Sequence, residues 1–71
     1  MIETKMVNED ANYQIEMLNS NSEENEKEWL YITTEYSFSV ATDVAVNIKN
    51  ATGGNLRVIS IRSNNQILAE I

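Results

Sequence analysis

The chain has 71 residues, a formal net charge of −6, and neither cysteine nor histidine. A chain this short forms one domain with a small core, because it buries only about 60% of the surface that its unfolded form exposes. Disulfide bonds are excluded, and zinc, haem and iron–sulfur sites lose their usual ligands. We therefore expect no cofactor and no metal, and a core that gains from forming a homo-oligomer.

Catalysis and membrane contact also have little support in the composition. Without cysteine and histidine, the usual nucleophile–base pairs and the proton shuttle near neutral pH cannot be built. A domain of this size also lacks the volume for a deep cleft. No run approaches the roughly 20 apolar residues that a membrane span needs, and the N-terminus lacks the apolar run of a secretory signal. We expect a non-enzymatic, cytoplasmic protein.

The charge is concentrated in the first part of the chain. Residues 1–28 hold eight acidic side chains against two lysines, whereas residues 29–71 are neutral. Residues 1–12 alternate poorly, which predicts a loose arm or a short edge strand near residues 5–7. Tyr13, Ile15 and Met17 then alternate with polar residues, which is typical of a half-buried strand. Residues 19–28 have no apolar side chain and predict a solvated acidic loop.

Three further segments carry strand signals. Residues 29–36 are rich in aromatic and β-branched residues, with Leu30 and Ile32 on one side and Trp29 and Tyr31 on the other. Residues 56–62 and 66–71 predict a hairpin. Its turn is at residues 64–65, where two asparagines tolerate positive φ.

Residues 37–52 fit two periods. Alternation of Phe38 and Val40 with polar neighbours suits a long strand, whereas a helical period gathers most apolar residues of this segment within about half a turn. The length favours a helix, as do Ser37 or Ser39 as N-cap and the glycines at 53–54 as a stop. We therefore predict one helix over about residues 37–52.

The predicted fold is a small, single-domain α+β protein of ββαββ order that spans residues 1–71. One helix covers one face of a four-stranded antiparallel sheet. Apolar side chains remain for the other face, and patches of this kind usually mark contact surfaces. The candidate interface residues are Trp29, Tyr31, Ile59, Ile61 and Leu68. A slip of one residue in register would instead turn Trp29 into the core.

This layout resembles that of small accessory proteins of tailed phages. The resemblance covers residues 29–71 and rests on the alanine-containing helix, the two glycines, the Arg57–Val58–Ile59 strand and the closing strand. It carries over no catalytic residue. It implies a modulator that binds a host protein in the host cytoplasm.

The acidic loop contains four carboxylates whose chemistry allows several readings: Glu23, Glu24, Glu26 and Glu28. They lack the spacing and the glycine turn of a calcium loop, which favours a solvated charge run. They could also orient an encounter with a basic partner, or imitate nucleic-acid phosphates. Direct nucleic-acid binding is not expected, since the cations Lys49, Arg57 and Arg62 form no dense patch.

We therefore predict a protein–protein interaction module. It binds a second copy or a host protein through the sheet face that the helix leaves free. The alternative is an acidic nucleic-acid mimic that inhibits a basic host protein.

Overall fold

The computed structural model describes residues 11–71, and its elements follow the order ββαββ with a short 3₁₀ helix added. The arm or edge strand predicted for the N-terminus falls almost wholly on residues 1–10, outside the described residues. The elements are β1 (Tyr13–Leu18), β2 (Trp29–Glu35), α2 (Phe38–Thr52), β3 (Leu56–Ser60), η1 (Ile61–Ser63) and β4 (Gln66–Glu70). This confirms the predicted α+β class and element order.

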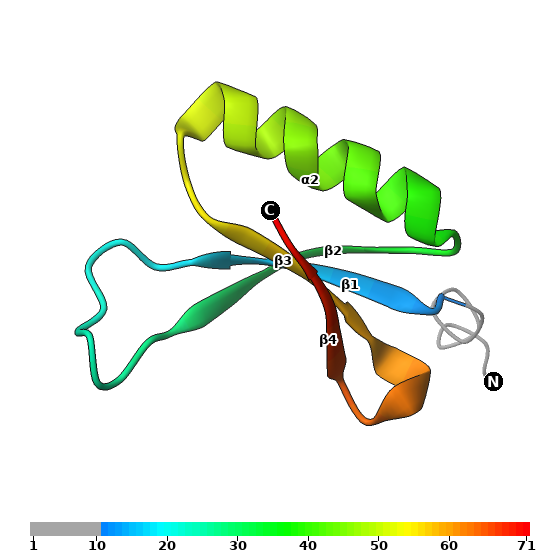
Figure 1. Ribbon diagram of the computed structural model, residues 1–71, viewed down its shortest axis with the longest axis horizontal. Helices are drawn as coiled ribbons and strands as arrows, with labels where there is room; N and C mark the ends of the chain where they lie inside the picture. The colour runs from blue at the N-terminus through cyan, green and yellow to red at the C-terminus, as the bar shows by residue number, and fades with distance from the viewer. Residues whose placement is uncertain (1–10) are drawn as a thin grey trace, which may run out of the picture.

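The four strands form one antiparallel sheet in the order β2-β1-β3-β4, and α2 lies across one of its faces (Figure 1). The edges are therefore β2 and β4. The pairing shifts by one residue at two places, which inserts Ile32 into β2 opposite β1 and Leu68 into β4 opposite β3. Such bulges bend a strand and increase its twist, and both occur on the edge strands.

The core lies between α2 and the three strands β1, β3 and β2. Its fully buried members are Ile15, Ala41, Ala45, Leu56 and Val58. Two alanines on the helix let its backbone approach the sheet closely, so the core is thin. Around these residues pack partly buried side chains from β1, β2, α2 and β4 and from the residue after β4: Tyr13, Met17, Ile32, Val44, Ile48, Ala69 and Ile71. The predicted common face of Tyr13, Ile15 and Met17 is confirmed.

Both ends of α2 carry the predicted caps. The Ser37 hydroxyl accepts a hydrogen bond from the Val40 N–H at 3.3 Å. At the other end Gly53 has φ +74° and donates its N–H to the Lys49 carbonyl at 2.7 Å. The left-handed conformation of Gly53 suits a residue without Cβ, and it turns the chain back toward β3. No helix among residues 11–71 is long and apolar enough to cross a membrane.

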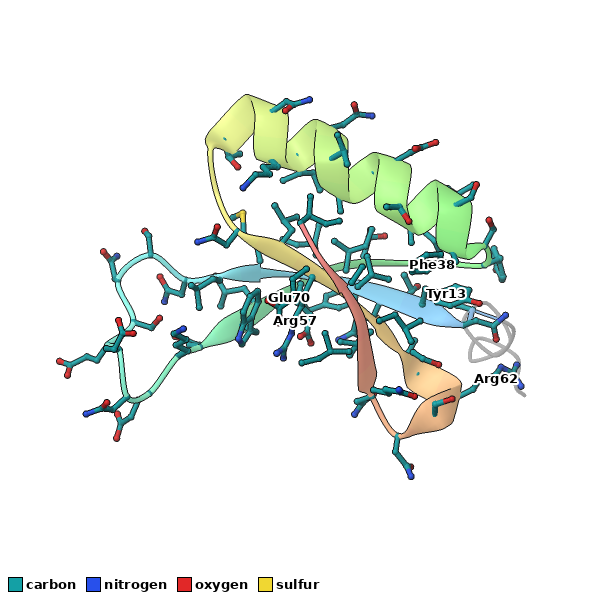
Figure 2. The ribbon with its side chains drawn as sticks, viewed as in Figure 1. Tyr13, Phe38, Arg57, Arg62 and Glu70 are labelled. Carbon is teal, nitrogen blue, oxygen red and sulfur yellow. The ribbon has the colours of Figure 1, made fainter. Side chains whose placement is uncertain are left out.

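The helical face that contacts the sheet is narrower than the sequence period suggests. Phe38 and Val40 belong to the predicted apolar arc, yet they are 40% and 45% exposed. A single helix touches the sheet along one stripe, and Ala41, Val44, Ala45 and Ile48 supply it. The Phe38 ring instead lies at the edge of this layer, where it contacts Tyr13 with centroids 5.7 Å apart (Figure 2).

The strand predicted over residues 56–62 is too long by two residues. β3 ends at Ser60, which pairs with Tyr13 at the start of β1, so no β1 residue remains for the strand to pair with. The Ile61 N–H donates to the Asn12 carbonyl at 2.9 Å, and the chain turns into η1. The predicted asparagine turn follows and is confirmed, since Asn64 and Asn65 have φ values of 57° and 61°.

Candidate interaction surface

Among residues 11–71, no helix lies over the second face of the sheet, and we call this face the open face. Successive side chains of a strand point to opposite faces of the sheet. The residues next to a core residue therefore point to the open face, and so do the residues paired with them on the neighbouring strands. Alternation and pairing place on this face Gln14, Glu16, Leu18, Trp29, Tyr31, Thr34, Arg57, Ile59, Ile67, Leu68 and Glu70. The open face is therefore a mixture of aromatic, aliphatic and charged residues.

A charged and aromatic network occupies the middle of the open face. Arg57 donates from Nε and Nη2 to Oε1 of Glu16, both at 2.8 Å. The Trp29 ring lies against the same guanidinium, 4.2 Å from its carbon to the ring centroid. The second carboxylate oxygen of Glu16 accepts from Gln14 Nε2 at 2.7 Å. The side chains of Arg57 and Glu16 are only 21% and 12% exposed, so this pair is shielded from most of the solvent.

Strand pairing puts this network into a row across the sheet. Glu16 lies between Tyr31 on β2 and Arg57 on β3, and Arg57 in turn lies opposite Glu70 on β4. Figure 2 shows Arg57 and Glu70 side by side where β3 and β4 cross in the view. This row therefore begins at an aromatic residue of β2 and ends at a carboxylate of β4, with the Glu16–Arg57 pair on the two central strands.

The structure places the five predicted interface residues in different situations. Tyr31 is 60% exposed and Leu68 is 40% exposed on the open face, and Trp29 is half-buried there over Arg57. Ile59 lies on this face but is only 3% exposed, so it offers almost no area to a partner. Ile61 lies in η1, beyond the end of the strand, and is 36% exposed.

Sequence reasoning did not select several residues of the open face, among them Glu16, Arg57, Ile67 and Glu70. Their shared feature is a cross-strand partner, and partners follow from register, which one sequence does not display. Ile67 was set aside because alternation without a bulge puts it on the side opposite Leu68. The insertion at Leu68 brings Ile67 opposite Ile59 instead, and Ile67 is 45% exposed.

The acidic loop extends beyond the sheet between β1 and β2 (Figure 1). At its base the Asn19 N–H donates to the Glu28 carbonyl at 2.8 Å, and Asn19 Nδ2 donates to Glu28 Oε1 at 2.9 Å. At its tip the Glu26 N–H donates to the Glu23 carbonyl at 3.0 Å. All four predicted glutamates are exposed. Within residues 11–71, no three acidic side chains are grouped so that they could hold a metal ion.

Comparison of the chain with protein-family models, with curated proteins and with solved structures finds no match. The open face, the acidic loop and the cavities next to them are therefore the features from which a function can be inferred.

Proposed function

We propose that this protein is a non-enzymatic interaction module that self-associates through the open face. The observation that supports it most is the grouping of Trp29, Tyr31 and Arg57 on one uncovered sheet face. These three residue types dominate the energetic centres of protein interfaces. The Arg57–Glu16 pair holds its geometry within one chain, so binding would not have to order it.

A second copy suits this face because the core of one copy is thin. Covering the open face would turn a two-layer domain into four layers, with the two sheets about 10 Å apart. Four strands of this length have a footprint of about 400 Å². Specific interfaces usually bury about 800 Å² per partner. The self-association that we propose is therefore of modest affinity, in the micromolar range.

Charge gives this proposal a distinctive salt dependence. Among residues placed on the open face, the charged ones are Glu16, Arg57 and Glu70, so the contact itself is close to neutral. The net charge of −6 makes two whole chains repel each other. Because salt screens that repulsion over a distance of about 10 Å or less, added salt strengthens the association of two copies. It weakens the capture of a basic partner by the acidic loop.

The test is sedimentation equilibrium over the micromolar range at about 0.05 M and about 0.5 M salt. Leu68→Glu places a charge on the open face, and Val46→Glu is its matched control, because each side chain is 40% exposed and Val46 lies on α2. We expect the wild type and Val46→Glu to associate, more tightly at high salt. We expect Leu68→Glu to remain monomeric.

Three results contradict the proposal. One is a monomeric wild type at every concentration and salt level. Another is equal loss of association in Leu68→Glu and Val46→Glu. The third is association that disappears as salt rises, which would favour the acidic loop and the alternative of a nucleic-acid mimic.

A further inference from the structure

We infer a second binding site on the other side of the molecule, at the outer edge of β2 and the cavity beside Leu30. We propose that it binds an extended, basic segment of another protein, which adds a strand to β2 and places one aliphatic side chain in the cavity. This site shares Leu18 with the open face but does not depend on the self-association proposed above.

The cavity lies between the end of α2 and the base of the acidic loop. Its volume is about 280 Å³, and its apolar walls are Met17, Leu18 and Leu30, with residues 52–54 opposite them. The backbone closes one side tightly, since a Cβ on Gly54 would stand 3.0 Å from Met17 Sδ. Sites for whole small molecules usually measure about 300–1,000 Å³. This cavity therefore suits one or two side chains of a peptide.

The edge of β2 next to the cavity has backbone groups available for a further strand. The Leu18 N–H donates toward β3, to the Asn55 carbonyl at 2.9 Å, whereas the Asn19 N–H donates to the Glu28 carbonyl. Because pairs alternate along an antiparallel ladder, the backbone groups of Trp29 and Tyr31 point away from β1. In the described part of the chain, no strand lies beyond β2.

The same edge lacks two of the usual defences against pairing, although the bulge at Ile32 interrupts it next to Tyr31. Residues 29–35 contain no proline and no lysine, which are common protections of an edge strand. Leu30, between the two outward-pointing residues, is 38% exposed and forms part of the cavity wall. A strand added here would thus lay alternate side chains beside Leu30, as in other cases of strand addition.

The charges around the cavity indicate which side chains the bound segment must carry. Glu28 stands at the loop base, held by Asn19, and Asn19 lines the cavity. Glu23, Glu24 and Glu26 continue the negative charge outward along the loop. At the opposite wall, Lys49 offsets the partial negative charge of the C-terminal end of α2, since its Nζ donates to the Gly54 carbonyl at 3.1 Å, so the negative charge of the site comes from the loop. An aliphatic side chain flanked by lysine or arginine complements both the cavity and its surroundings.

The test uses a synthetic capped heptapeptide, Lys-Lys-Val-Leu-Val-Lys-Lys, and two controls. One control has alanine in place of leucine, and the other has glutamate in place of every lysine. Binding is followed by backbone amide shifts and by the fluorescence of the single tryptophan. We expect shifts at residues 29–31 and 52–54, about tenfold weaker binding of the alanine peptide, and no binding of the glutamate peptide.

Protein variants assign the contact. Leu30→Gln should lower the affinity for the leucine peptide about tenfold and leave self-association unchanged. Leu68→Gln is its matched control, at 40% against 38% exposure, and should still bind the peptide. Glu28→Gln should weaken binding severalfold, and Glu70→Gln on β4 should not.

Several outcomes would overturn this inference. They are equal binding of the leucine and alanine peptides, amide shifts confined to β3 and β4, and unchanged affinity in Leu30→Gln. The comparison of the leucine and alanine peptides uses the wild-type protein, so it decides the question even where Leu30→Gln does not fold. A monomeric Leu68→Glu chain that still binds the leucine peptide would separate this site from the proposed self-association.

Discussion

Different interactions stabilise the two faces of the sheet. Under α2, the side chains of Ile15, Leu56 and Val58 are fully buried and purely apolar. On the open face, the middle of the sheet is an ion pair with a tryptophan against it. The first face gains free energy from area removed from water. The second depends on cross-strand partners whose contribution requires correct register.

This difference shows how residues 11–71 can form a sheet with a helix over only one face. An entirely apolar open face would be a large exposed patch, which promotes aggregation. The half-buried Glu16–Arg57 pair interrupts that patch and fixes strand register, since it joins β1 to β3. The exposed apolar residues are left at the two sides, on β2 and β4, where they remain available for contact.

Leu56→Ala breaks the covered face and should have the largest effect. Removing a fully buried leucine costs about 3 kcal/mol or more, and the core of a chain this small supplies only about 3–5 kcal/mol. We expect a largely unfolded protein by circular dichroism. Ile67→Ala on β4, which is 45% exposed, should lose less than about 1 kcal/mol in urea unfolding. Similar losses in the two variants would mean that the faces do not differ in this way.

Arg57→Met tests the open face. Exposed ion pairs contribute about 0–1 kcal/mol, whereas breaking a buried one costs about 3–5 kcal/mol. The pair with Glu16 lies between these limits, at 21% and 12% exposure. We expect a loss of about 2 kcal/mol in urea unfolding. Glu16→Gln, which keeps an oxygen for Arg57 to donate to, should lose less. An Arg57→Met protein with an unchanged free energy of unfolding would show that the network does not stabilise the fold.

The two faces were also unequally predictable from sequence. The period of Tyr13, Ile15 and Met17, the caps at Ser37 and Gly53, and the asparagine turn are local signals, and the structure confirms each of them. Residue pairs such as Glu16 with Arg57 are 41 positions apart. Their contact depends on the strand order and on two bulges, which leave no local trace in a single sequence.

Gly53→Ala tests the connection that sets α2 over the covered face. Gly53 has φ +74°, and a Cβ there would meet nothing within 4 Å. The cost is therefore backbone strain alone, about 1 kcal/mol. Gly54→Ala has no such strain, and its Cβ would meet the flexible side chain of Met17 at 3.0 Å and Thr52 Oγ1 at 3.3 Å. In thermal unfolding, Gly53→Ala should have a lower midpoint temperature than the wild type. A Gly53→Ala protein as stable as the wild type would show that the left-handed conformation at this position does not require glycine.

Tyr31→Ala should have the smallest effect on folding and the sharpest effect on assembly. The side chain is 60% exposed, and surface substitutions of this kind usually change the free energy of unfolding by less than about 0.5 kcal/mol. Unfolding measured on dilute, monomeric protein should therefore be nearly unchanged. At concentrations where the wild type associates, the same variant should sediment as a monomer, because an aromatic anchor at an interface contributes about 2 kcal/mol or more. Tyr36→Ala, at 58% exposure on the segment before α2, is the matched control and should keep the association. A protein that loses stability without losing association would place Tyr31 in the fold of one chain and remove it from the proposed interface.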